Sequence, residues 1–194
     1  MKRLCVFCGS NRGREPIYAR AAQELGTALV RRGWGLVYGG GHVGLMGTIA
    51  DAVLEAGGEV VGVIPQALVD KELAHRGLTT LHVTVTMHER KALMADLSDA
   101  FAALPGAYGT ADELFEILTW AQLGLHTKPI GILNVAGFFD PLLAWVDKAV
   151  SEEFLKRKHR ERLFVAENAE ELLDRLLNAE PVEATSKWIV AKDR

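Results

Sequence analysis

The sequence predicts an α/β fold: a single Rossmann-like domain in which a parallel sheet is flanked by helices on both faces. Short apolar runs rich in β-branched residues alternate with helical patterns from end to end, as in repeated strand–helix–strand units. The chain has 194 residues, of which 49% are hydrophobic, enough for one large domain with a real core. It contains no internal repeat, low-complexity segment or interdomain linker.

The expected elements follow one another in strict alternation. Short apolar runs place strands at residues 4–8, 35–38, 60–64, 81–85, 100–104, 129–133 and 163–166. Helical patterns fill the intervals, at residues 16–32, 44–56, 87–98, 110–125, 141–153 and 169–179. Residues 1–180 are expected to form the Rossmann-like domain, and residues 181–194 are expected to form an irregular tail, although Trp188, Ile189 and Val190 could dock on the domain.

Charge and hydropathy exclude several classes of partner. The formal net charge is -3, and no basic stretch is interleaved with aromatics, which argues against nucleic acid. No segment approaches the length of a membrane span, and the first residues hold too short an apolar run for a signal peptide. We therefore expect a cytoplasmic protein that binds a small molecule.

Cys5 and Cys8 form a CxxC pair, which in other contexts does redox chemistry. Here the run reads as a buried strand, where residues three apart point to opposite faces, so the sulfurs are expected to be small buried hydrophobes. The histidines show no metal-ligand spacing. We expect neither a metal site nor a cofactor.

In an open parallel sheet, ligands bind outside the carboxyl ends of the strands. Three loops at such ends are rich in glycine or hydroxyl groups, and all should lie on one edge. They are residues 9–11, 39–47 and 105–110.

The second loop, within YGGGHVGLMG, contains GxGxxG at Gly39, Gly41 and Gly44. The next strand does not end in the acid of a dinucleotide fold, so the pattern favours a phosphate or ribose site made by backbone N–H groups rather than NAD binding. The alternative is a tight turn that needs glycine for packing. The candidate residues of this phosphate or ribose site are Ser10, Gly40, Gly41 and Gly44.

Two helix starts carry charged residues toward the same edge. Thr110 and Glu113 have the spacing of a capping box, which is the structural alternative to a functional role for Glu113. Thr86 and Glu89 have the same spacing and place Arg90 and Lys91 near a helix start. Cations there oppose the helix dipole, and no carboxylate follows three or four residues later. This favours an anionic ligand or a carboxylate across the cleft; the alternative is two solvated side chains.

The order of these motifs, a glycine loop with GLMG, then Arg90-Lys91, then PGAYGTADE, resembles the LONELY GUY (LOG) family of cytokinin-activating phosphoribohydrolases. Some members of that family were once labelled lysine decarboxylases. The resemblance extends from the first strand to about residue 134. Ala107 departs from it, because the family motif PGGxGTxxE has a glycine there. If that position requires a positive φ, alanine costs about 1 kcal/mol; otherwise its methyl group narrows the pocket.

The resemblance implies a hydrolase that cleaves the N-glycosidic bond of a nucleoside 5′-monophosphate, of the N6-substituted adenine type or AMP, to free base and ribose 5-phosphate. It implies catalytic roles for Arg90 and Glu113 and a homodimer. The substrate-binding residues would be Glu72, Arg90, Lys91, Ala107, Tyr108, Gly109, Thr110, Ala111, Asp112, Glu113 and Thr119. The alternatives are a non-catalytic nucleotide- or molybdenum-cofactor-binding protein and a general AMP nucleosidase. The helix expected at 110–125 also has more apolar surface than one sheet face can cover, which favours a dimer over burial by a neighbouring helix.

Overall fold

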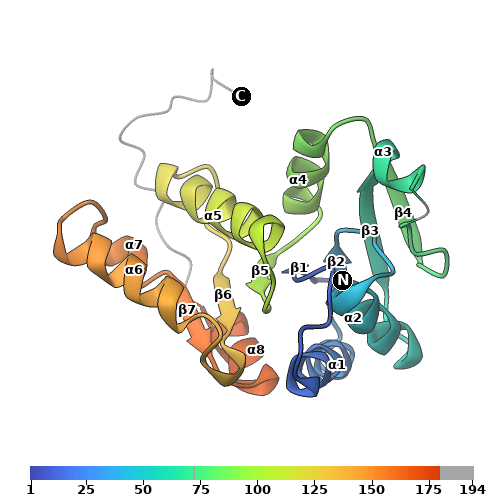
Figure 1. The fold of residues 1–194 in the computed structure, drawn as a ribbon, viewed down its shortest axis with the longest axis horizontal. Helices are drawn as coiled ribbons and strands as arrows, with labels where there is room; N and C mark the ends of the chain where they lie inside the picture. The colour runs from blue at the N-terminus through green and yellow to red at the C-terminus, as the bar shows by residue number, and fades with distance from the viewer. Residues whose placement is uncertain (72, 180–194) are drawn as a thin grey trace.

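The computed structural model describes residues 1–71 and 73–179, and its strands form one parallel sheet (Figure 1). The strand order is β4-β3-β2-β1-β5-β6-β7. Every predicted strand is present, within two residues at either end: β1 Arg3–Phe7, β2 Gly35–Tyr38, β3 Val60–Pro65, β4 Thr80–Thr84, β5 Ala100–Ala103, β6 Ile130–Leu133 and β7 Leu163–Ala166. The expected tail, residues 181–194 with Trp188, Ile189 and Val190, lies outside the described residues.

The predicted helices cover both faces of this sheet. They are α1 Pro16–Arg31, α2 Gly44–Glu55, α4 Met87–Asp96, α5 Tyr108–Leu123, α6 Asp140–Ser151 and α8 Ala169–Leu177. Three short helical segments were not predicted, because each is too short to show a helical period in the sequence. They are α3 Gln66–Val69, the 3-10 turn η1 Val135–Gly137 and α7 Arg157–Arg160.

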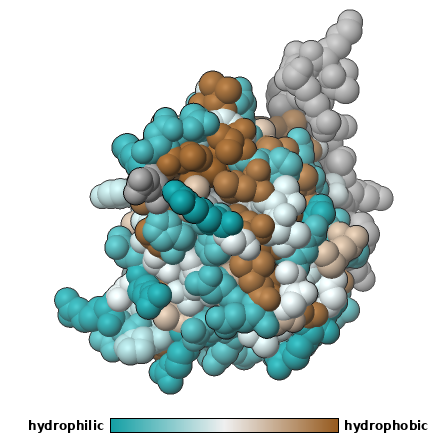
Figure 2. Space-filling model, turned by 90° about the vertical axis from the view of Figure 1, so that its right-hand side faces the viewer, coloured by the Kyte–Doolittle hydropathy of each residue, from teal (hydrophilic) through white to brown (hydrophobic). Residues whose placement is uncertain are grey.

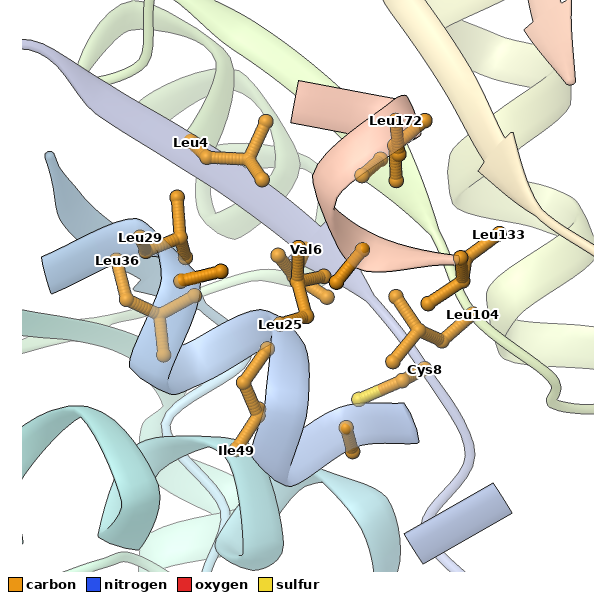
Figure 3. Packing of buried hydrophobic residues seen from close by; sticks show 14 of the residues in the cluster. Leu4, Val6, Cys8, Leu25, Leu29, Leu36, Ile49, Leu104, Leu133 and Leu172 are labelled. Atoms are coloured by element: carbon orange, nitrogen blue, oxygen red, sulfur yellow. The ribbon is translucent and has the colours of Figure 1, made fainter. Parts of the chain in front are cut away.

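The central strand β1 contributes to the core on both sides. Leu4, Val6 and Cys8 belong to the cluster formed with α1, α2 and α8, part of which is drawn in Figure 3. Cys5 and Phe7 belong to the cluster formed with α4, α5 and α6. The two cysteines are free and buried in different clusters, as the alternation of side chains along a strand predicts.

The two helix starts for which the sequence offers a capping box differ in the structure. At α4 the expectation is confirmed: Thr86 Oγ1 accepts from the Glu89 N–H at 3.1 Å, and the Glu89 carboxylate accepts from the Thr86 N–H at 3.3 Å. At α5 the alternative of a Thr110–Glu113 box is wrong. The helix begins two residues earlier, at Tyr108, and its N-cap residue Ala107 makes no side-chain bond.

The topology fixes where a ligand can bind. From β1 the chain passes to β2, β3 and β4 on one side, then crosses to β5 on the other side of β1. The loops after β1 and β5 therefore diverge to opposite faces, and a crevice opens between them at the carboxyl edge. Among the described residues, no helix is both long and apolar enough to cross a membrane.

Candidate active site

The three loops singled out in the sequence meet at this crevice. The Gly9 N–H donates to the carbonyl of Pro105 at 3.0 Å, which joins the β1 and β5 loops. The Leu45 N–H at the start of α2 donates to the carbonyl of Gly9, also at 3.0 Å. The β1 loop is thus held from both sides by backbone bonds, which gives the edge a fixed shape.

A pocket of about 350 Å³ lies between these loops, the start of α5 and one residue of α4. It combines backbone groups from two glycine-containing loops with one buried cation and one buried carboxylate. Six of the residues expected to form the site line it: Ser10, Arg90, Ala107, Gly109, Thr110 and Glu113.

Arg90 reaches the pocket from the second turn of α4. Its Nε donates to the Val63 carbonyl at 3.0 Å and its Nη2 to the Gly39 carbonyl at 3.4 Å, which anchors the guanidinium to the ends of β3 and β2. Its Nη1 lies 3.2 Å from Oε1 of Glu113. Only 11% of the Arg90 side chain is exposed. The sequence suggested a carboxylate across the cleft as one possible partner of Arg90, and that carboxylate is Glu113.

Glu113 lies on the inner face of the first turns of α5, with 10% of its side chain exposed. Burial raises the pKa of its carboxyl above the usual value, and Arg90 opposes that shift. A buried carboxylate with one cationic partner is an arrangement typical of functional sites. Such a group can stabilise developing positive charge and accept a proton from water.

From the glycine-containing segment 39–47, Leu45 and Met46 line the pocket. Gly40, Gly41 and Gly44 do not line the pocket. Gly44 has a φ of +61°, and a Cβ there would lie 2.2 Å from the Ser10 carbonyl carbon. The loop thus follows the structural alternative at Gly44: glycine allows the β1 loop to pack against the start of α2.

The first turns of α5 divide into residues on the pocket and residues away from it. Gly109 lines the pocket, and a Cβ built there would meet no protein atom within 4 Å, so packing does not require glycine at this position. Packing does require glycine at Gly106, just before the helix, since a Cβ there would lie 2.0 Å from Thr110 Oγ1. Tyr108 is 95% exposed. Tyr108, Ala111 and Asp112 are absent from the pocket wall.

Ala107 has a φ of -117°, so the concern that alanine is strained here is wrong. The backbone of Ala107 is not left-handed, so this position does not require glycine for its conformation. Ala107 lines the pocket, so its methyl group is what distinguishes it there from glycine.

Two further expected residues, Lys91 and Thr119, do not line this pocket. Lys91 pairs with acids of α5 and is not on the pocket wall. Thr119 donates to the Phe115 carbonyl at 2.7 Å and lines a separate groove on the outer side of α5. Glu72 falls outside the described residues. Its chain neighbour Leu73 accepts from the His42 N–H at 3.0 Å, so that segment is joined to the glycine loop.

Sequence reasoning missed an aromatic wall of the pocket. Tyr18 of α1 and Phe138 after β6 line the pocket, and their rings meet edge to face at 5.9 Å. Phe138 follows Ala136, whose φ of 51° is unusual for a residue other than glycine. The available signal was position: Phe138 comes shortly after the carboxyl end of β6, the neighbour of β5.

A second and larger groove, of about 570 Å³, runs along the outer side of α5, next to α6 and α7. Phe115 of α5 meets Trp145 of α6 edge to face at 5.6 Å, so α6 covers part of the apolar surface of α5. Trp145 and Phe154 remain 62% and 87% exposed. A neighbouring helix therefore accounts for only part of the surplus apolar surface. Figure 2 shows that apolar side chains also gather on the side of the molecule where β4 lies. Val83 of β4 and Val85 just after it are among the exposed apolar residues.

Comparisons with known proteins agree with the arrangement of the motifs. A family model described as "Possible lysine decarboxylase" matches residues 46–176. A cytokinin riboside 5′-monophosphate phosphoribohydrolase of Arabidopsis thaliana is 49% identical over 195 residues, covering 98% of this chain and 86% of the relative. A probable enzyme of the same name from Oryza sativa subsp. japonica is 53% identical over 174 residues, covering 90% and 78%.

Among solved structures, the molybdenum cofactor binding protein of the bacterium Rippkaea orientalis superposes with a TM-score of 0.69. It is 22% identical, and the match covers 92% of this chain and 99% of that one. At this identity the likeness concerns the fold.

Proposed function

The chain belongs to the LOG family of cytokinin riboside 5′-monophosphate phosphoribohydrolases, and from that premise we propose how its pocket performs the reaction. The protein is an N-glycosyl hydrolase of a nucleoside 5′-monophosphate, from which it releases the free base and ribose 5-phosphate. The observation that carries our assignment of the site is the buried ion pair of Arg90 and Glu113 on the wall of the pocket.

Glu113 is the catalytic carboxylate in this proposal. Breaking the bond between the anomeric carbon and the base nitrogen leaves positive charge on the sugar, and a carboxylate nearby stabilises that charge. The same group can take a proton from the water that adds to the anomeric carbon. The bonding electrons leave with the base, so the attacking water supplies a hydroxyl group to the sugar and its proton balances the charge of the departing base. Arg90 holds the carboxylate in place and keeps it ionised.

The 5′-phosphate would bind at the start of α5. Backbone N–H groups at a helix N-terminus attract an anion, and the Gly109 backbone can be approached because no side chain covers it. Thr110 and Ser10 add hydroxyl groups on the same wall. Cys8 also reaches the wall, but burial raises the pKa of its thiol, so it stays protonated and is a poor nucleophile.

The base-release assay tests this function. Purified protein is incubated with AMP, GMP, CMP and isopentenyl-AMP, and with the matching nucleosides, and free base is measured by chromatography. Release from isopentenyl-AMP above AMP assigns the N6-substituted preference, and comparable release from both assigns a general AMP nucleosidase. A carrier that binds a nucleotide or molybdenum cofactor without catalysis would release no base.

The proposal extends to assembly and location. We propose a homodimer that buries the groove beside α5, because Trp145 and Phe154 leave a wide apolar surface next to the site. Glu113 and Phe115 are on the same helix, so a partner seated there would lie close to the pocket.

We also propose a cytosolic location, since the two cysteines are free and buried, as is usual in a reducing compartment. Cell fractionation tests the location.

A further inference from the structure

Lys91 links α4 to α5 beside the catalytic pair. Its Nζ lies 3.1 Å from Oδ2 of Asp112 and 3.0 Å from Oε1 of Glu116. The Lys91 side chain is 10% exposed, whereas the side chains of Asp112 and Glu116 are 60% and 23% exposed. Lys91 does not line the pocket. Its ammonium group is therefore occupied by protein carboxylates rather than directed at a ligand.

The two acids that Lys91 binds flank Glu113. Asp112 precedes Glu113 in the chain, and Glu116 follows it by about one helical turn. Their negative charges raise the pKa of Glu113 in addition to burial, whereas Arg90 and Lys91 lower it. The Glu113 charge also acts on the thiols of Cys5 in β1 and of Cys8 just after it, whose pKa values are raised mainly by burial.

We propose that Lys91 is a positioning residue that acts through Asp112 and Glu116: it neutralises the two acids beside Glu113 and thereby keeps the catalytic carboxylate ionised. This inference rests on the proposed role of Glu113. The sequence-based expectation that Lys91 contacts the substrate is the alternative that the experiment below distinguishes from this role. Three carboxylates within five residues of one helix would otherwise repel one another, and Lys91 is the cation that bridges Asp112 and Glu116.

The test compares Lys91→Met with the triple variant Lys91→Met, Asp112→Asn, Glu116→Gln, in which the two acids are neutral as well. The matched control is Lys128→Met. Lys128 also binds α4, donating to the Ala95 carbonyl at 2.8 Å, but it is not paired with either acid. For each protein kcat and KM are measured from acidic to neutral pH, and circular dichroism checks folding. The Glu113 carboxyl is titrated directly by NMR with 13C-labelled glutamate, using Glu113→Gln to assign its signal.

We expect Lys91→Met to move the acid limb of kcat to higher pH, with a loss on the order of tenfold on that limb and a KM changed by less than about twofold. The triple variant returns the limb toward its original position, and Lys128→Met leaves it in place. A large rise in KM without recovery in the triple variant would show that Lys91 binds substrate, which overturns the inference. So would a Glu113 titration unchanged in Lys91→Met. The NMR titration does not need turnover, so a protein that released no base would refute the proposed function while this measurement still decided the role of Lys91.

Discussion

Gly39 lies against the guanidinium of Arg90, and a Cβ at Gly39 would lie 2.0 Å from Nη2. No side chain can occupy that position while Arg90 keeps its place. The first glycine of the GxGxxG pattern therefore makes room for an arginine that comes 51 residues later in the chain. A glycine that resembles part of a phosphate loop is explained here by the packing of the catalytic pair.

Gly39→Ala should therefore impair catalysis. The added methyl displaces the guanidinium from Glu113, so we expect kcat to fall by about 10²-fold, with the fold retained. Gly77→Ala is the control, because a Cβ there would meet only the His75 ring, at 3.3 Å. Steady-state kinetics of both variants measure the difference. Equal activity of Gly39→Ala and wild type would show that the position of Arg90 does not matter.

Glu113→Gln and Arg90→Ala should each abolish turnover in a folded protein. Glutamine keeps the shape but carries no charge, and we expect a loss of at least about 10²-fold in kcat. Arg90→Ala leaves the Glu113 carboxylate buried without its partner, so this variant should also unfold at a lower temperature. Base release and thermal denaturation are the measurements. Wild-type rates in both variants would refute the assignment of the catalytic residues.

The stability of Glu113→Gln relative to wild type should depend on pH. Burial raises the pKa of Glu113 in the folded state, so the folded protein holds this proton more tightly than the unfolded chain. The stabilisation that the Glu113 carboxyl gives to the folded protein is then complete below the ordinary carboxyl pKa, and it is lost as pH rises through the pKa of the folded state. Melting curves should favour Glu113→Gln increasingly from acidic to neutral pH, with the exposed Glu55→Gln as control. The opposite trend would mean that the pKa is lowered.

Activity should require the 5′-phosphate. The start of α5 provides backbone donors and an accessible Gly109, and binding the phosphate there would fix the sugar against Glu113. We expect kcat/KM for adenosine to be at least about 100-fold below that for AMP, because energy from a remote group is used at the reacting centre. Comparable hydrolysis of adenosine and AMP, measured by chromatography, would remove the argument for a phosphate site.

The protein should be a dimer that Trp145→Asp disrupts. A charge at this exposed indole would be buried in the proposed interface, so light scattering should show a mass near the 21.2 kDa of one chain instead of twice that value. Ile17→Asp on α1 is the control, since Ile17 is exposed at another part of the molecule. A wild-type monomer that is fully active at nanomolar concentration would contradict this prediction.

Regular elements and motif order were readable from the sequence because their signals are local. Alternating apolar runs and helical periods predicted every strand of the sheet, and the parallel topology predicted that the loops after β1, β2 and β5 meet at one edge. The capping box of Thr86 and Glu89 was also predictable, since it depends on residues three apart. The family resemblance came from the same source, the order of short motifs.

Only the tertiary structure decided which partner each charged residue takes. Arg90 and Lys91 are adjacent in the chain, but successive helix residues point in different directions, so one faces Glu113 in the pocket and the other Asp112 and Glu116 outside it. The start of α5 at Tyr108, which removes the alternative Thr110–Glu113 box, follows a β5 loop that is bonded to the distant β1 loop. Such pairings join residues far apart in sequence, and no local pattern encodes the distance between them.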